Sequence, residues 1–204
     1  MNSNWEDDLN SEQEVAKFLD KYFYQKKMIS FKRITDVDSQ YEGIDIILSY
    51  NDLKNILVDE KAQCSYVNKN LPTFAFEVNF IKNNKLCDGW LFSNNKKTEY
   101  YFLVWIKAKK EKHFTFEDII ELNCILVERK EIIDYLSKYS IDKNKSYEIA
   151  EHLRETKTTK FSNTNFEGFN FNFSNHLSEK PVNIVIQKEV LINLAHGMFV
   201  VKPD

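Results

Sequence analysis

Short apolar runs, several with a polar residue at every second position, recur along this chain and predict a protein rich in β-strands. Strand side chains point alternately to the two faces of a sheet, so a period of two marks a strand with one buried face. We expect strands at residues 29–34, 44–48, 56–63, 74–80, 99–108, 119–127 and 181–187. The stretch 99–108 is the most apolar, which predicts a central strand buried on both faces.

Apolar residues spaced three and four apart predict helices at four places along the chain. These helices cover residues 11–25, 130–139, 146–156 and 188–197. In the first helix, Ser11 is the expected N-cap, and Glu14 completes a capping box. Gly197 is the expected end of the last helix, because glycine readily adopts the left-handed conformation that follows a helix.

Together these elements predict an α/β (α+β) fold, in which a mixed central sheet is flanked by helices. A length of 204 residues and a hydrophobic content of 43% suit one domain with a sizeable core. We therefore expect a single domain over residues 1–204, with a C-terminal appendage from about residue 161 as an alternative. Residues 161–176 are rich in Phe and Asn, and fit either a hairpin with inward phenylalanines or a loop that orders on binding.

The strands at 44–48 and 56–63 are joined by S-Y-N-D-L-K-N, a segment rich in turn formers, which predicts a hairpin. Alternation along the second strand puts Asp59, Lys61 and Gln63 on one face. Asp45 is the single charge in the first strand, and an isolated carboxylate is costly to bury unless it is paired or binds a metal. If the two strands pair, Asp45 lies near Asp59 and Lys61.

Two carboxylates and a lysine at one point have a clear chemical use. Carboxylates at close range repel unless a divalent cation neutralises them, and oxygen-only ligands suit Mg²⁺. A bound Mg²⁺ lowers the pKa of its water and clamps a phosphate oxygen. Lys61 could then orient the attacking water or stabilise charge that grows on the phosphate. The alternative is that the Asp-Glu-Lys segment forms a solvated strand end, with Asp45 capping a backbone group.

The spacing D-x(13)-D-x-K, formed by Asp45, Asp59 and Lys61, resembles the motif of the PD-(D/E)xK nuclease superfamily. This resemblance implies a restriction-endonuclease-like fold, with the two acids as metal ligands and the lysine as a catalytic group. Gln63 is similar to a glutamine that some members carry at this place. Gly43 and Ile44 precede Asp45, so the proline in the family's name is absent.

Nucleases of this superfamily often bring a further acid from the first helix to the metal. Glu12 is our candidate for that ligand, and Glu14 is the second choice. The alternative is that acids in a first helical turn simply interact with the helix dipole. Glu77 would join the acidic site only if its strand lay beside the strand of Asp59.

The formal net charge of −3 gives no overall basic field, so nucleic-acid binding would need a local basic patch. The densest basic run covers residues 107–113, and either contacts phosphate or forms a solvated loop. Trp90 either stacks on a base or anchors a loop to the core.

The class of protein follows from what the chain lacks. Its three cysteines are widely spaced and odd in number, which favours reduced thiols in the cytoplasm. No run approaches the ~18 apolar residues of a membrane span, and the N-terminus carries no apolar signal region. We therefore expect a cytoplasmic protein that does not bind membranes.

The predicted function is that of a Mg²⁺- or Mn²⁺-dependent endonuclease acting on nucleic acid, with DNA as the expected substrate. Asp45, Asp59 and Glu12 are the predicted metal ligands, and Lys61 and Gln63 the further catalytic residues. A second hypothesis is a non-catalytic nucleic-acid-binding or interaction protein on the same fold. A homodimer would suit cleavage of both strands of a duplex.

Overall fold

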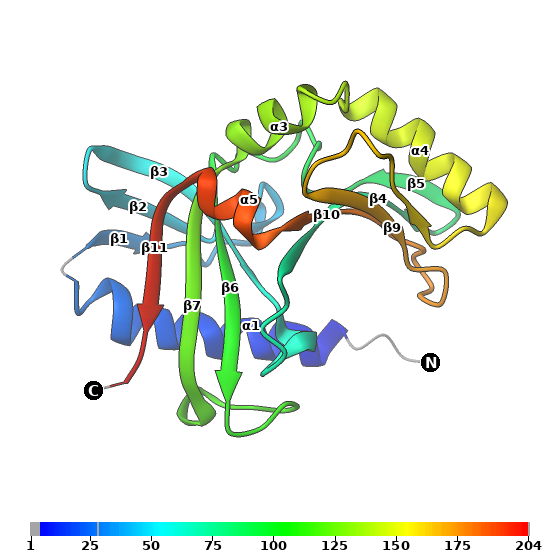
Figure 1. The fold of residues 1–204 in the computed structure, drawn as a ribbon. Coiled ribbons are helices and arrows are strands. Elements are labelled where there is room, and N and C mark those ends of the chain that lie inside the picture. Colours follow the sequence, from blue (N-terminus) through cyan, green and yellow to red (C-terminus); the bar gives the residue numbers. More distant parts are fainter. Residues whose placement is uncertain (1–4, 28, 204) are drawn as a thin grey trace. The chain divides into compact units, whose positions relative to one another are not determined.

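The structure is a computed structural model that describes residues 5–27 and 29–203 (Figure 1). Over these residues it is a mixed α/β protein with two sheets and five α-helices, as the sequence predicts at the level of fold class. Its internal contacts divide the chain into two compact units. Unit 1 comprises Met1–Leu71, Lys97–Glu128 and Ala195–Asp204, and unit 2 comprises Pro72–Lys96 and Arg129–Leu194. The division therefore does not fall at residue 161, where we had placed the alternative appendage.

Unit 1 contains a six-stranded mixed sheet. Its strands, in spatial order, are β1 (Ser30–Arg33), β2 (Ile46–Tyr50), β3 (Leu53–Ala62), β6 (Tyr100–Ala108), β7 (Ile119–Glu128) and β11 (Ala195–Val201). Strands β3 and β6 are parallel, and all other neighbours in this sheet are antiparallel. The predicted hairpin is confirmed as β2 and β3, and β6 is central and buried along most of its length.

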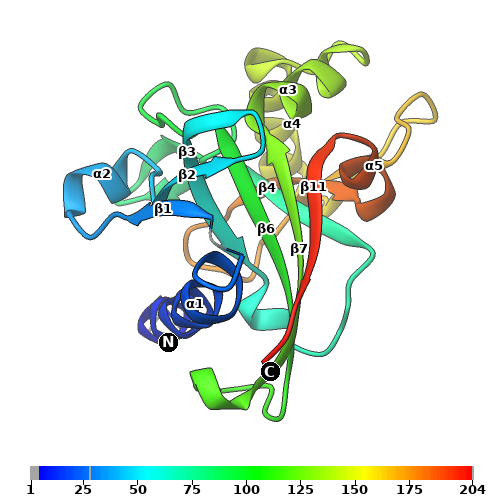
Figure 2. The ribbon, with the colours of Figure 1, turned by 90° about the vertical axis from the view of Figure 1, so that its left-hand side faces the viewer.

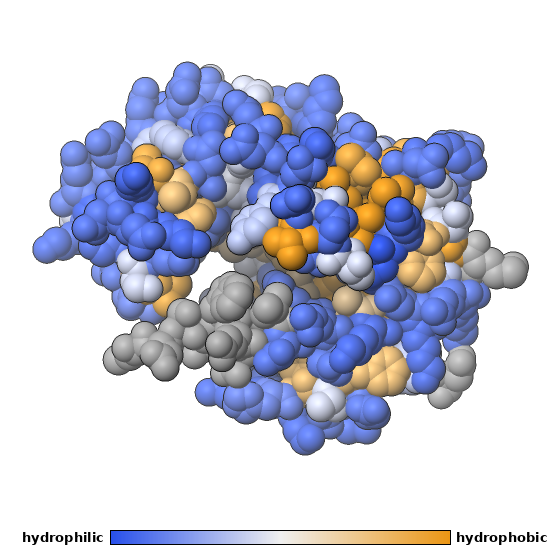
Figure 3. All heavy atoms as spheres, turned by 180° about the vertical axis from the view of Figure 1, so that it is seen from behind, coloured by the Kyte–Doolittle hydropathy of each residue, from blue (hydrophilic) through white to orange (hydrophobic). Residues whose placement is uncertain are grey.

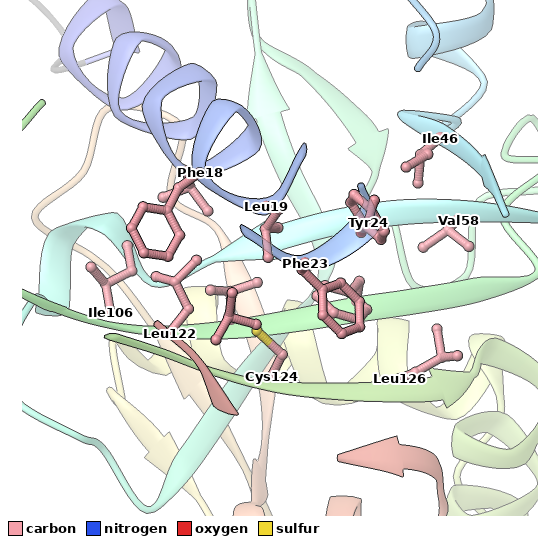
Figure 4. Close-up of a cluster of buried hydrophobic side chains, with 14 of the residues drawn as sticks. Phe18, Leu19, Phe23, Tyr24, Ile46, Val58, Ile106, Leu122, Cys124 and Leu126 are labelled. Carbon is pink, nitrogen blue, oxygen red and sulfur yellow. The ribbon is translucent and has the colours of Figure 1, made fainter. Parts of the chain in front are cut away.

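The helical elements of unit 1 are short, apart from the first. They are α1 (Trp5–Leu19), the π-helical turn η1 (Asp20–Tyr24), α2 (Val37–Tyr41), and the 3-10 turns η2 (Cys64–Tyr66) and η3 (Phe116–Asp118). Helix α1 lies along one face of the sheet (Figure 2), and Phe18, Phe23 and Tyr24 of α1 and η1 pack on that face (Figure 4). Phe18 and Phe23 lie over this face beside Val58, Ile106 and Leu126, and together they form the core that fixes α1 against β3.

Unit 2 contains a five-stranded antiparallel sheet. Its strands, in spatial order, are β5 (Lys85–Asp88), β4 (Thr73–Lys82), β10 (Val182–Gln187), β9 (Phe169–Phe173) and β8 (Lys160–Phe161). The helices of this unit are α3 (Arg129–Ser137), α4 (Lys143–Thr156) and α5 (Lys188–Asn193). The Phe/Asn segment is thus a pair of strands, and Phe169, Phe171 and Phe173 point into the core of unit 2 as the hairpin hypothesis required.

Two helix boundaries differ from the prediction. The first helix begins before the expected N-cap, so Ser11 lies inside α1 rather than capping it. The last helix ends at Asn193, and Gly197 lies in β11 instead of ending a helix. Residues 195–201 have a period-two burial pattern and pair with β7, so the gain from completing the sheet outweighs the helical spacing of the apolar residues.

The surface carries scattered large apolar side chains among hydrophilic ones, as one face seen in Figure 3 shows. Among the described helices, none combines the length and the apolar character that a membrane crossing requires. The three cysteines, Cys64, Cys87 and Cys124, are free thiols.

Candidate metal centre

The register of the β2–β3 hairpin brings Asp45 to the middle of β3. Ile46 is the Cα partner of Val58, and the Asp45 amide donates to the Val58 carbonyl oxygen at 3.0 Å. Asp45 is the residue immediately before β2, not a residue in the middle of a strand as we predicted. Its carboxylate Oδ2 accepts a hydrogen bond of 2.8 Å from the backbone N–H of Glu60. The side chain is therefore directed at β3, next to Asp59.

The turn before Asp45 is stabilised by hydrogen bonds from Lys97 and Thr98, in a second segment of unit 1. Gly43 has φ of +76°, a left-handed conformation that glycine adopts without strain. The hydroxyl of the buried Thr98 donates to the Gly43 carbonyl oxygen at 2.7 Å. The Lys97 amide donates to the Glu42 carbonyl oxygen at 2.7 Å. These contacts fix the backbone two residues before Asp45.

Asp59 and Lys61 form a close ion pair within β3. Asp59 is only 2% exposed, and the Lys61 Nζ lies 2.5 Å from its Oδ1. Their partners on the parallel strand β6 are Tyr101 and Leu103, which are fully buried. The strand beside the ion pair is therefore apolar, so water has little access to the charges from that direction.

The charges at this site do not balance. Burial raises the pKa of Asp59 to about 7, the nearby ammonium of Lys61 opposes that rise, and the Asp45 carboxylate adds to it. Burial also disfavours the charged form of Lys61, but the carboxylates of Asp59, Asp45 and Glu12 outweigh that effect and raise its pKa. One ammonium thus faces an excess of negative charge, which a proton or a divalent cation would neutralise.

Glu12 acts electrostatically on the lysine of this site. It is exposed on α1, and its charge acts on Lys61. Among the described residues, the carboxylates of Glu12, Asp45 and Asp59 do not bring three oxygens within 4.8 Å of one another. Glu12 would have to move closer to act as a direct ligand.

Gln63 lies just beyond the strand that carries the motif. Strand β3 ends at Ala62, and the Gln63 backbone turns into η2 with φ of −81° and ψ of 62°. Its amide N–H donates to the Val104 carbonyl oxygen at 3.0 Å. Gln63 therefore lies one residue past the end of β3 and keeps a backbone hydrogen bond to β6.

The other two acids considered above have structural positions. Glu14 pairs with Lys17 at 2.5 Å and accepts a hydrogen bond of 2.7 Å from the Phe116 amide, so it ties α1 to η3. Glu77 belongs to β4, which pairs with β5 and β10 and not with β3. The arrangement that would have brought Glu77 to the acidic site is therefore not present.

On the opposite face of β3 the structure shows a buried ionic cluster that the sequence reading missed. The Tyr24 hydroxyl donates to Glu60 at 2.6 Å, and Arg33 bridges Glu60 and Asp20. Burial raises the pKa of Glu60, and Arg33 opposes that rise. The period-two pattern did place Glu60 away from Asp59, but it did not identify Arg33 as the partner of Glu60. The signal in the sequence that could have indicated this cluster is Glu60, an acid next to the motif on an otherwise apolar face of β3.

The predicted nucleic-acid contacts have local partners. Lys110 pairs with Asp118 at 3.0 Å, and Lys109 Nζ donates to the Glu117 carbonyl oxygen at 3.0 Å. These two lysines therefore tie the basic loop to η3. In unit 2, the Trp90 ring lies 5.1 Å from that of Phe76, centroid to centroid, which supports the loop-anchor interpretation.

Comparison of the chain with family models, with curated proteins and with solved structures gave no match.

Proposed function

We propose that unit 1 is a nuclease that uses Mg²⁺ or Mn²⁺ to hydrolyse phosphodiester bonds, with DNA as the expected substrate. The observation that carries this proposal is the meeting of Asp45, Asp59 and Lys61 at one point of β3. The PD-(D/E)xK resemblance led us to expect a mixed central sheet flanked by helices. The mixed sheet of unit 1, with α1 on one face, is consistent with that expectation, and we extend the proposal to a restriction-endonuclease-like fold for this unit.

The donor set at this point fits a hard divalent cation. Asp45 and Asp59 offer carboxylate oxygens, the ligands that Mg²⁺ and Mn²⁺ prefer. Burial and mutual repulsion make two negative charges costly here, so a cation would relieve the same imbalance that raises the pKa of Asp59. Glu12, already close enough to influence Lys61, is the candidate for a further ligand or for a hydrogen bond to metal-bound water.

In this proposal each side chain has a separate task. Asp45 and Asp59 hold the cation, which when bound supplies a more acidic water and a contact for a phosphate oxygen. The Glu60 amide holds the Asp45 carboxylate in a fixed orientation. Lys61 keeps its proton at neutral pH because three carboxylates stabilise its charge. Its ammonium can therefore stabilise negative charge that develops on the scissile phosphate.

The Lys61–Asp59 contact favours a second candidate, a nucleic-acid-binding protein without catalysis. A lysine paired at 2.5 Å with a proposed ligand occupies part of that ligand's coordinating capacity. If the Lys61–Asp59 pair persists in the presence of Mg²⁺, Asp59 would not hold the cation. The protein would then bind nucleic acid without cleaving it. A measurement of cation binding that does not depend on activity separates the two functions.

The test combines cleavage with calorimetry. Supercoiled, linear and single-stranded DNA and RNA are incubated with Mg²⁺, with Mn²⁺ and with EDTA, and cation binding is titrated without nucleic acid. We expect metal-dependent cleavage by the wild type and its loss in Asp59→Asn, with the fold retained. Asp52→Asn is the matched control, since Asp52 is an exposed residue in the turn of the same hairpin. An Asp59→Asn variant as active as the wild type would contradict the assignment.

A further inference from the structure

The outer edge of β11 is the surface of unit 1 at which we expect a partner strand to bind. β11 pairs with β7 on one side and is the last strand of its sheet on the other (Figures 1 and 2). The edge of a sheet presents backbone N–H and C=O groups without strand partners, and proteins normally protect such edges with charges, proline or short length. The chemistry of that edge therefore shows whether a partner strand is expected.

The other sheet edges of the described chain are protected in the usual way. β1 has four residues and ends in Lys32 and Arg33. β5 also has four residues, with Lys85 and Asp88 at its ends. β8 has only two residues, the first of which is Lys160. Each of these edges is short and carries charge, so pairing with another chain is disfavoured.

β11 differs from these edges in both respects. It has seven residues, A-H-G-M-F-V-V, with no Lys, Arg, Asp or Glu and no Pro. Its register against β7 shifts between Ala195 and Gly197, and the strand is regular from Gly197 to Val201. Met198 and Val200 share one face and are 60% and 61% exposed. This strand combines an open backbone edge with an exposed face that carries His196, Met198 and Val200.

The strand is held rigidly in place by its other face. The Phe199 ring lies 4.7 Å from the Phe23 ring and 5.9 Å from the Phe102 ring, measured between centroids. Because Phe199 is anchored in the core, the exposed positions of Met198 and Val200 are fixed by alternation. An edge that is ordered before it binds loses little conformational entropy when a second strand is added.

We infer that β11 pairs antiparallel with β11 of a second copy of this chain, so that the six-stranded sheets of two protomers form one continuous sheet. In a symmetric antiparallel pair, each residue of β11 faces another residue of the same strand sequence across the two-fold axis. A strand that carried like charges would therefore repel its own copy. The absence of charged residues from β11 is what self-pairing requires. A two-fold axis perpendicular to the sheet puts the corresponding faces of the two sheets on the same side. Met198 and Val200 of both copies would then form one apolar row.

Neither the metal centre nor the proposed activity enters this inference. Strand pairing of this length buries a modest area, so we expect a dimer that dissociates on dilution through the micromolar range. Sedimentation equilibrium of the full chain over that range measures the association. Amide hydrogen exchange of Met198–Val201 at low and high protein concentration locates the interface on the unmodified protein.

The decisive variant is Met198→Lys combined with Val200→Lys. It places like charges across the symmetric pair, and should raise the dimer dissociation constant about tenfold or more. The control is Leu177→Lys, which replaces a 48% exposed leucine in a turn of unit 2 and should leave the dimer unchanged. Far-ultraviolet circular dichroism checks that each variant is folded.

Four results would overturn the inference. The first is a wild-type chain that stays monomeric throughout the concentration range. The second is a dimer that the lysines do not weaken. The third is exchange of the β11 amides that does not slow as protein concentration rises, which needs no variant and so holds even if the double substitution prevents folding. Pairing of β11 with an unrelated strand peptide by a monomeric chain would likewise exclude a second copy as the occupant.

Discussion

The backbone N–H of Glu60 donates a hydrogen bond of 2.8 Å to the Asp45 carboxylate. Through this bond, the strand that carries Asp59 and Lys61 also orients the acid that precedes the neighbouring strand. The side chain of Glu60 points the other way, into the cluster with Arg33 and Tyr24. One residue thus contacts the candidate site with its backbone and the buried ionic cluster with its side chain.

Asp59 should make the metal-free protein less stable as the pH rises. Its pKa in the folded state is raised to about 7 by burial, above the ordinary value near ~3.9. The folded state favours the neutral carboxyl of Asp59. The contribution of Asp59 to the free energy of unfolding is therefore fully present below about pH 4 and is lost as the pH rises through about 7. The loss should be on the order of a few kcal/mol. Urea unfolding of wild type and Asp59→Asn, from pH 5 to pH 8 in EDTA, measures it.

The prediction concerns the slope of stability against pH, because Asp59→Asn also removes a partner of Lys61. The variant should lose less stability than the wild type between pH 5 and pH 8. Parallel profiles for the two proteins would show that Asp59 does not titrate in this range.

Lys61→Ala separates a catalytic lysine from a surface lysine. A catalytic ammonium at a dry site stabilises the transition state by a few kcal/mol, so the single-turnover cleavage rate should fall roughly 10²-fold. Lys61→Arg should restore the rate only in part, because the planar guanidinium does not occupy the space of a compact ammonium. Cleavage is measured at saturating Mg²⁺, beside a melting curve for each variant. An Ala variant that cleaves at the wild-type rate would remove Lys61 from the mechanism.

The Arg33–Glu60 pair should show strong coupling. Removing one partner leaves the other charge buried, which typically costs about 3–5 kcal/mol, whereas replacing both with apolar residues costs much less. We expect Arg33→Met and Glu60→Leu each to destabilise unit 1 by more than the double variant does. Urea unfolding of the four proteins gives the coupling free energy directly. Additive effects would mean that solvent screens this pair.

Thr98→Val should loosen the turn before Asp45. It removes the hydroxyl that donates to the Gly43 carbonyl oxygen and leaves that buried acceptor without this bond, at a cost of about 1–3 kcal/mol. Cation affinity, measured by calorimetry, should fall because Asp45 is less well positioned, and Thr98→Ser should recover most of it. Equal affinity in the Val and Ser variants would limit Thr98 to a role in stability.

Much of the fold could be read from periodicity, because burial of one face leaves a clear trace in the sequence. The β2–β3 hairpin and the central position of β6 followed from apolar alternation. The division into two units did not, since the chain crosses between them four times, at Leu71/Pro72, Lys96/Lys97, Glu128/Arg129 and Leu194/Ala195, and no local pattern marks these points as boundaries. Local pattern carries no information about which sheet a strand will join.

The candidate site shows the same limit at the level of single residues. Asp45 and Asp59 were placed together by strand register, which depends only on the hairpin. The roles of Glu14 and Glu77 depended on elements far away in the sequence, and both were decided by tertiary contacts. The role of Arg33 was not predicted because a basic residue on a short edge strand usually faces solvent. The structure shows its side chain 21% exposed and paired with Asp20 of η1 and with Glu60.

The chain enters unit 1 three times, and the last visit is the final strand. During synthesis on a ribosome, the residues that form β1, β2 and β3 emerge first, and β11 emerges only after the residues of unit 2. A nascent chain released early therefore carries both acids and the lysine on a sheet that ends at β7, with one side of that strand exposed. The six-stranded sheet is therefore completed only after all the residues of unit 2 have been made.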